Sequence, residues 1–274
     1  CKTIIGFGSP NKSGKASSHG SPLGDEEIGL VRKKLKWNNE PFEIPKDILN
    51  AWREIGEKGI KLEEKWLEIL DKKNSNIKST LKDTYTDSNL KDLENLIKKQ
   101  KTKYFESKPS MATRQCSSAA IESISSILPQ LIGGSADLSG SNNTKTNNSK
   151  VISSKNFDGN YIHYGVREHG MAAVMNGLAL YSGLIPYGGT FLIFSDYCKP
   201  SIRLSALMGL KVIYIFSHDS IGLGEDGPTH QPIEQLEGLR SIPNLLVLRP
   251  CDAIETFECW EIAIEENKTP SALI

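Results

Sequence analysis

The clearest hydrophobic pattern lies in residues 109–274, where short apolar runs alternate with longer amphipathic stretches. The apolar runs predict strands at residues 131–132, 161–164, 190–194, 211–216, 245–250 and 272–274. Helical spacing of apolar residues predicts helices at residues 112–128, 171–178, 201–209, 233–239 and 253–267. Strands that alternate with helices in this way indicate an α/β fold, in which helices cover both faces of a parallel sheet.

A different pattern runs through residues 41–108, where apolar residues recur every three or four positions in a Lys- and Glu-rich background. This spacing predicts one or two amphipathic helices, and a further helix near residues 90–99. Gly56 and Gly59 are expected to break or bend the first of them. We interpret the region as a helical linker with a solvated outer face, rather than as a charge-based binding site.

Residues 1–40 have a third pattern. A short strand is expected at residues 3–5, followed by a Gly-, Ser- and Lys-rich loop and a helix that begins near Asp25. The chain starts with Cys1 rather than Met, and strands are expected close to both of its ends. Because strands need neighbours, the sequence is expected to be a segment of a longer chain.

Composition and charge narrow the function classes. The 274 residues are 38% hydrophobic, and 33 Lys and Arg balance 33 Asp and Glu. No global field therefore favours nucleic acid or an anionic membrane, and neither is an expected partner. The five cysteines lack zinc-ligand spacing, and no membrane-length apolar run or signal peptide is visible. Reduced thiols and a cytoplasmic location are expected.

Polar segments follow several of the predicted strands, at the sheet edge where ligands of such folds bind. The loop at residues 217–232 holds His218, Asp226 and His230, which bind anions and hydroxyls near neutral pH. An ordinary surface loop is the alternative interpretation. His19 stands among small flexible residues, where a surface position is the default, although Gly-rich loops also close over phosphates.

Two further groups have both an ordinary and a functional interpretation. Phe191, Phe194 and Tyr197 recur every three residues, which is typical of core packing but also of a pocket for a flat heterocycle. Arg114 and Ser141, each an ordinary surface residue alone, would together hold a phosphate at the ligand edge. A guanidinium group suits this because it binds phosphate oxygens through two hydrogen bonds.

Several long motifs, taken in order, resemble those of the transketolase family. They are "KTIIGFGSPNKSG", "HGSPLG", "LIGGSADLSGSN", "YIHYGVREHGMAAVMNG", "YGGTFLIFSDY", "RLSALMG" and "THQPIEQL". The resemblance covers essentially the whole chain. It implies the tail of a diphosphate-binding domain at residues 1–40, a helical linker at 41–108, and a pyrimidine-binding α/β domain at 109–274 that is truncated at its C-terminal end.

The resemblance also implies an activity of the pentose phosphate pathway. Enzymes of this family transfer a two-carbon ketol unit from a ketose phosphate to an aldose phosphate, with thiamine diphosphate and a divalent metal, magnesium or calcium. They work as homodimers, with the site between subunits. The segment that would hold the metal is not in this sequence, so the metal ligands are expected to lie outside it.

Roles at the cofactor follow from the same match. Glu168, in "REH", resembles the family's catalytic carboxylate, which hydrogen-bonds the aminopyrimidine ring and promotes activation of the thiazolium carbon. Phe191, Phe194 and Tyr197 resemble the aromatic pocket for that ring. Asp137 resembles an acid near the thiamine at the subunit contact.

Roles at the substrate follow in the same way. Three residues resemble holders of the sugar phosphate: Arg114, Ser141 and His218. Asp226 resembles a contact to a substrate hydroxyl. His230 and His19 resemble catalytic histidines near the reacting carbon, which bind hydroxyls, help to move protons or touch the diphosphate.

One departure and two alternatives remain. Gly140 stands where the family often has proline, which would loosen the loop that carries Ser141. A ketol transferase like dihydroxyacetone synthase is the alternative enzyme. A non-catalytic dimerising module is the alternative if the natural chain is this short, and residues 1–274 alone are expected to be inactive.

Overall fold

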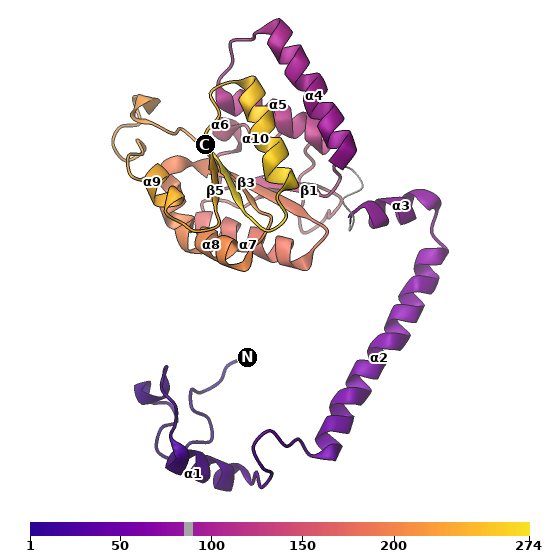
Figure 1. The fold of residues 1–274 in the computed structure, drawn as a ribbon, viewed down its shortest axis with the longest axis vertical. Helices are drawn as coiled ribbons and strands as arrows, with labels where there is room; N and C mark the ends of the chain where they lie inside the picture. The colour runs from indigo at the N-terminus through magenta and orange to yellow at the C-terminus, as the bar shows by residue number, and fades with distance from the viewer. Residues whose placement is uncertain (85–89) are drawn as a thin grey trace. The chain divides into compact units, whose positions relative to one another are not determined.

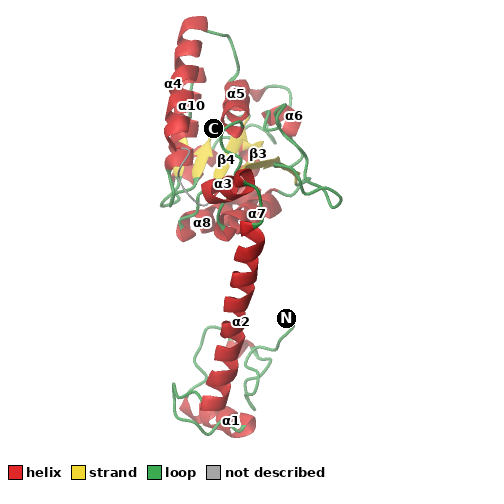
Figure 2. Cartoon of the chain, turned by 90° about the vertical axis from the view of Figure 1, so that its right-hand side faces the viewer, coloured by secondary structure: helices red, strands yellow, loops and turns green. Residues whose placement is uncertain are grey.

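The structure is a computed structural model that describes residues 1–84 and 90–274 (Figure 1). Two compact units make up the chain, Cys1–Lys73 and Asn74–Ile274. The second unit is built around a sheet, and the described part of the first consists of helices and loops (Figure 2).

The sheet of the second unit has six strands, and every pairing between them is parallel. The strands are β1 (Leu131–Ser135), β2 (Tyr161–His163), β3 (Ile185–Phe191), β4 (Ile213–Ser217), β5 (Leu246–Leu248) and β6 (Ser271–Leu273). Their order across the sheet is β2-β1-β3-β4-β6-β5. The chain therefore moves to one side of β1 to form β2, and then crosses to the other side to form β3.

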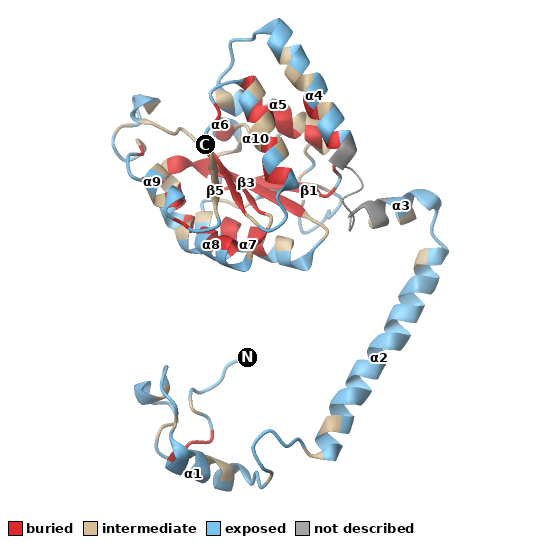
Figure 3. Ribbon diagram, in the orientation of Figure 1, coloured by how far each residue is buried: buried red, intermediate tan, exposed pale blue. Residues whose placement is uncertain are grey.

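Helices cover both faces of this sheet, as the alternating pattern predicts (Figure 1). One face carries α4 (Leu90–Ser107), α5 (Thr113–Ser125) and α10 (Ala253–Glu265), and the other carries α7 (Glu168–Tyr181) and α8 (Ser195–Met208). The shorter α3 (Ser75–Thr84), α6 (Ser139–Asn142) and α9 (Gln235–Arg240) complete the unit. Figure 3 shows the buried residues concentrated in the sheet and on the inner sides of these helices.

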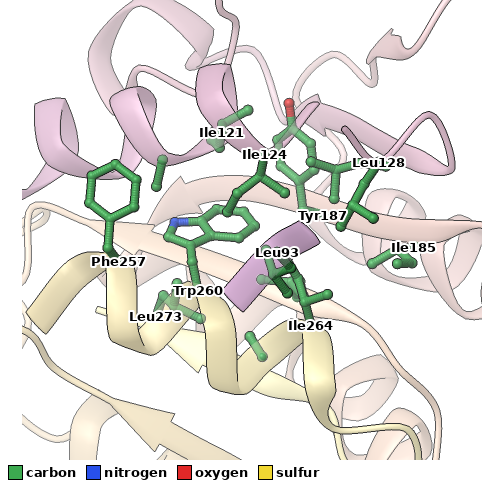
Figure 4. Packing of buried hydrophobic residues seen from close by; sticks show 14 of the residues in the cluster. Leu93, Ile121, Ile124, Leu128, Ile185, Tyr187, Phe257, Trp260, Ile264 and Leu273 are labelled. Carbon is green, nitrogen blue, oxygen red and sulfur yellow. The ribbon is translucent and has the colours of Figure 1, made fainter. Parts of the chain in front are cut away.

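Trp260 of α10 lies at the centre of the core on one face of the sheet (Figure 4). Its side chain is fully buried, and its ring meets Tyr187 edge-on at a centroid distance of 5.8 Å. Its indole Nε1 donates a hydrogen bond to Ser117 Oγ at 3.0 Å, so its one polar atom has a partner. Leu93 of α4 belongs to the same cluster, which attaches that helix to the sheet domain.

Two pairs of adjacent glycines lie in the central strands β1 and β3. They are Gly133, Gly134, Gly188 and Gly189. At each of the four, an added Cβ would lie 2.5 Å or less from an atom of another side chain. A Cβ at Gly133 would meet the Tyr187 ring at 1.9 Å, and one at Gly188 would meet Met175 Sδ at 2.4 Å. Side chains from neighbouring elements thus rest directly on the backbone of the sheet.

The first unit contains α1 (Asp25–Leu35) and α2 (Lys46–Asp71). Before α1, the chain is held by the Glu27 carboxylate, which accepts a hydrogen bond from the Ser9 hydroxyl. It also accepts bonds from the backbone and the side-chain N–H groups of Asn11, both at 2.9 Å. These bonds, that of Ser9 foremost, lower the pKa of Glu27 from 4.5 to about 2. They fasten the loop before α1 to that helix.

Three expectations about secondary structure are wrong. Residues 3–5 form no strand. The unit Cys1–Lys73 is described throughout, and within it no strand pairs with these residues. Turn hydrogen bonds, such as that from Gly14 N–H to Ile5 O, take the place of strand pairing. The break expected at Gly56 and Gly59 does not occur, because α2 is continuous through both, and the alternative of a bend stays a prediction. The strand expected at residues 190–194 spans Ile185–Phe191 instead, since Leu192–Phe194 curl into a 3₁₀ turn.

The other elements confirm the expected α/β fold. The expected helix near residues 90–99 extends to Ser107, and the helix near Asp25 begins at that residue. The helix expected at residues 201–209 begins earlier, at Ser195, so that its first turn carries Tyr197. The remaining strands and helices of the sheet domain lie where the pattern predicts, with ends displaced by a few residues. The domain limits at residues 40 and 108 stay a prediction.

Candidate functional site

A cavity of about 490 Å³ lies at the carboxyl ends of β1, β2 and β3. Its lining comes from the segments that follow those three strands: Ala136, Asp137, Leu138, Val166, Glu168, Phe194 and Tyr197. β2 lies on one side of β1 and β3 lies on the other, so the order of the strands reverses at β1. Open parallel sheets bind their ligands at such a point.

Glu168 reaches the cavity because the chain turns sharply between β2 and α7. Gly165, with φ of +69°, allows the turn, and Arg167 N–H closes it by donating to Gly165 O at 2.8 Å. Arg167 Nη1 also donates to Tyr164 O at 3.1 Å. Glu168 is then the first residue of α7, where the helix dipole favours a carboxylate. Its side chain is half-buried and lines the cavity.

Asp137 lines the same cavity from the turn after β1, with φ of +60°. Ser135, which is fully buried, supports this turn. Its hydroxyl donates to Gly189 O at 2.9 Å and accepts from Leu138 N–H at 3.2 Å and from Asn142 Nδ2 at 3.1 Å. The turn that carries Asp137 is therefore tied to β3, the strand that leads to the aromatic residues.

The three aromatic residues run from the core to the surface. Phe191, at the end of β3, is buried, and Phe194 follows in the 3₁₀ turn with a ring-centroid separation of 5.8 Å. Tyr197, in the first turn of α8, lies 6.0 Å from Phe194 and is 65% exposed. Phe194 and Tyr197 give the cavity two aromatic walls.

A second cavity, of about 270 Å³, lies at the carboxyl end of β4 and the start of α5. Arg114 and His218 both line it. His218 has φ of +57°, its Nδ1 is 2.9 Å from Ser217 Oγ, and its ring stacks on Phe191 at 3.8 Å. Burial first, and the Arg114 charge second, lower the pKa of His218, which favours the neutral ring.

Phe191 therefore stands between the two cavities. His230 lies edge-on to the same ring pair, 5.3 Å from Phe194 and 6.2 Å from Phe191. The charge of Asp226, an exposed residue of the same loop, opposes the lowering of the His218 pKa. Two aromatic rings and two histidines thus come together at one edge.

Five of the expected residues line neither cavity: Phe191, His230, Asp226, Ser141 and His19. Ser141 is exposed on α6 and is not among the residues that line the cavity of Arg114 and His218. His19 is exposed in the first unit, at the end of the 3₁₀ turn Ala16–Ser18. The functional roles of all the expected site residues stay predictions.

Sequence reasoning missed the residues that support the site. Ser135 and Asn142 are buried and hydrogen-bonded beneath the turn of Asp137. Their signal was present, because a polar residue at the end of an apolar strand must find a partner when it is buried. The partner itself is not encoded in the local pattern.

Within residues 1–84 and 90–274, no group of three or more His, Cys, Asp or Glu side chains is arranged to hold a metal ion. No helix in these same ranges is both long and apolar enough to cross a membrane. All five cysteines are unpaired.

Family comparison matches both parts of the chain. Residues 109–274 match the family model "Transketolase, pyrimidine binding domain", and residues 1–89 match "Transketolase, thiamine diphosphate binding domain". Curated relatives include the transketolases of Cereibacter sphaeroides, 49% identical over 277 residues, and Sinorhizobium medicae, 51% identical over 273 residues. Both alignments cover 100% of this chain but only 41% and 39% of the relatives.

Solved structures give the same result. A transketolase from Pichia stipitis in complex with sedoheptulose 7-phosphate is 36% identical, with a TM-score of 0.86. The transketolase of Campylobacter jejuni is 37% identical, with a TM-score of 0.79. Each comparison covers 99% of this chain and 41% of the other protein.

Proposed function

We propose that this chain, which belongs to the transketolase family, forms the tail of the diphosphate-binding domain, the linker and the pyrimidine-binding domain of an enzyme that uses thiamine diphosphate. That enzyme transfers a two-carbon ketol unit from a ketose phosphate to an aldose phosphate. One observation carries the proposal. Glu168, Asp137, Phe194 and Tyr197 meet around one cavity. Phe191 connects that group to the histidine of the neighbouring cavity.

The lining of the first cavity fits an aminopyrimidine ring. Phe194 and Tyr197 offer aromatic faces for stacking, and Glu168 offers a carboxylate to a ring nitrogen. When bound, thiamine diphosphate supplies an electron sink for making and breaking carbon–carbon bonds. In the proposed site Glu168 holds and returns a proton at the ring nitrogen, and Asp137 binds at the edge of the cofactor.

The second cavity fits a sugar phosphate. Arg114 presents a guanidinium group to phosphate oxygens, and His218 donates from its ring nitrogen. In this proposal Ser141 adds a hydroxyl to the phosphate and Asp226 accepts from a sugar hydroxyl. His230 and His19 orient hydroxyls and move protons beside the reacting carbon. The Arg114–His218 pair favours phosphorylated sugars over the unphosphorylated acceptors of a dihydroxyacetone-synthase-like enzyme.

A second copy of the chain is part of the proposal. Val166 and Tyr197 line the cofactor cavity but are 74% and 65% exposed. Leu204 and Leu207 on α8 are also 45% and 70% exposed. Apolar surface beside an open cavity favours closure by another subunit. Leu207→Glu should therefore lower the dimer fraction in sedimentation, whereas Ile221→Glu, at an equally exposed loop position, should not.

Three finer attributes complete the proposal. A divalent metal, magnesium or calcium, would accompany the diphosphate, and its ligands are proposed to lie outside residues 1–274. A cytoplasmic location is supported by the five unpaired cysteines. Ketose and aldose phosphates as substrates would place the activity in the pentose phosphate pathway.

A chimaera tests the proposal. Residues 1–274 replace the matching segment of the Cereibacter sphaeroides transketolase, and turnover of ketose and aldose phosphates is measured with thiamine diphosphate and magnesium. The chimaera should be active, and Glu168→Gln should slow proton exchange at the thiazolium carbon by about 10²–10⁴-fold, the usual value of a positioned acid–base group. A folded, cofactor-binding chimaera with an unchanged exchange rate in Glu168→Gln would refute the role of Glu168.

Arg114 is tested separately in the same chimaera. Arg114→Ala should raise KM for phosphorylated substrates by roughly tenfold to a hundredfold, because a charge-assisted hydrogen bond contributes about 1.5–3 kcal/mol. Unphosphorylated sugars should be much less affected. Equal losses for both substrate types would show that Arg114 does not bind the phosphate.

A further inference from the structure

Gln235, the first residue of α9, has a buried amide with partners on two different segments. Its side chain is only 2% exposed. Nε2 donates to Asp196 Oδ2 at 2.7 Å, and Oε1 accepts from the Ile233 backbone N–H at 3.0 Å. A buried amide with both ends satisfied holds its two partners at a fixed separation.

The two partners belong to the two sides of the candidate site. Asp196 lies in the first turn of α8, between Phe194 and Tyr197 in sequence. Ile233 closes the loop that carries His230. Hydrogen bonds within that loop, such as His230 N–H to Gly227 O at 3.0 Å, shape it but do not connect it to α8. The Gln235 amide makes that connection.

We infer that Gln235 is a positioning residue, which fixes the His230 ring against Phe191 and Phe194 by joining the His230 loop to the start of α8. The importance of that geometry for catalysis rests on the function proposed above. The geometric claim itself needs no cofactor or substrate.

The chemistry of the pair allows a sharp test. An amide can donate to Asp196 and accept from Ile233 at once, whereas a methionine of similar size does neither. A glutamate at 235 would accept from Ile233 but would face the Asp196 carboxylate, which is unfavourable. Pairing Gln235→Glu with Asp196→Asn reverses the donor and restores both hydrogen bonds. Asp196 is exposed, so Asp196→Ala breaks the connection without opening a cavity.

The measurement is the NMR signal of the imidazole Hε1 atoms in the 274-residue chain, which has only five histidines. His230 should carry a ring-current shift from Phe191 and Phe194 that exposed His19 lacks. Gln235→Met, Gln235→Glu and Asp196→Ala should each remove the larger part of that shift. The double variant Gln235→Glu/Asp196→Asn should recover it. Ser241→Ala, which removes an exposed hydroxyl at the end of α9, is the matched control and should leave the signal in place.

His169 serves as the internal reference, because its Nδ1 lies 3.2 Å from Ser201 Oγ of α8. The inference is overturned if the ring-current shift of His230 persists in Gln235→Met and Asp196→Ala. It is also overturned if the His230 and His169 signals change together, because that would indicate a general loss of packing. A folded double variant that does not recover the His230 shift would overturn it as well. Since no thiamine diphosphate is added, failure of the proposed function would leave this result unchanged.

Discussion

Both units of the chain contain amphipathic helices, but only the second unit buries their apolar faces within itself. In the unit Asn74–Ile274, apolar faces of helices on both sides of the sheet are buried within the unit itself. In the unit Cys1–Lys73, the buried residues are Gly8, Ser9 and Glu27, and none is a large apolar side chain. α2 buries no residue at all, and Trp52 and Leu62 on it are 70% and 68% exposed.

This difference shows that specifying a helix and stabilising it are separate properties of a sequence. The periodicity of α2 is sufficient to specify a helix, since helical spacing is a local property. Most helical stability in proteins comes from packing of the apolar face, however, and the first unit does not supply that packing from its own residues. The second unit should therefore hold most of the free energy of unfolding.

The largest expected effect comes from a matched pair of tryptophans. Trp260→Ala should destabilise the chain by about 3–5 kcal/mol, because it leaves a cavity in the core and leaves the Ser117 hydroxyl without its partner. Trp66→Ala in α2, where the side chain is 51% exposed, should change the unfolding midpoint little. Urea unfolding followed by circular dichroism measures both. Equal losses would contradict the division of stability between the units.

Phe194 should give an intermediate effect, because it lies at the boundary between core and site. Phe194→Ala should cost about 1–2 kcal/mol through its ring pairs with Phe191 and Tyr197, and should weaken thiamine diphosphate binding in the chimaera. Phe194→Tyr should keep part of both. Cofactor Kd and the apoenzyme Tm separate the two losses. A large fall in Tm with unchanged Kd would make Phe194 a core residue.

A smaller effect of opposite sign is expected in α2. An added Cβ at Gly56 or Gly59 meets nothing within 4 Å, and both positions lie inside a helix. Gly56→Ala and Gly59→Ala should each stabilise that helix by about 0.5–1 kcal/mol and leave the second unit unchanged. Amide exchange in α2 measures this. Faster exchange would show that the glycines serve a bend or a close contact.

A pH-dependent effect is confined to the loop at Glu27. Its folded-state pKa of about 2 lies below the ordinary 4.5, so its hydrogen bonds contribute fully above about pH 4.5 and are lost as pH falls through about 2. The Asn11 backbone amide signal should follow this titration. In Glu27→Gln the pH dependence should vanish. A midpoint near 4.5 in the wild-type chain would mean that the bonds do not hold the carboxylate.

The sheet domain was predictable because its elements repeat a short-range rule, strand then helix, with a few turn residues between them. The errors fall where that rule stops. The run "TFLIF" is apolar to its end, yet only its first two residues extend the strand, because the last three turn toward the site. The expected strand at residues 3–5 failed because pairing depends on a partner that local sequence does not specify.

The site was predictable in its chemistry but not in its support. Motifs and positions after strands singled out Glu168, Phe194 and His218, and the structure brings all three to the two cavities. Gln235 and Ser135 were not singled out, since their function depends on partners 39 and 54 residues away. Contacts at that separation are products of topology, which a single sequence does not display.

The glycine pairs of β1 and β3 have a consequence at the level of the gene. Every single-nucleotide change in a glycine codon that changes the amino acid introduces a residue with a Cβ. At Gly133 and Gly134 that atom would collide with tyrosine rings, so each missense mutation there starts with a steric cost of about 1–3 kcal/mol. At Gly56 and Gly59 the same mutations meet open space. Among descendant genes, the glycine codons at positions 133 and 134 should therefore be retained. Those at positions 56 and 59 should accumulate missense changes more often.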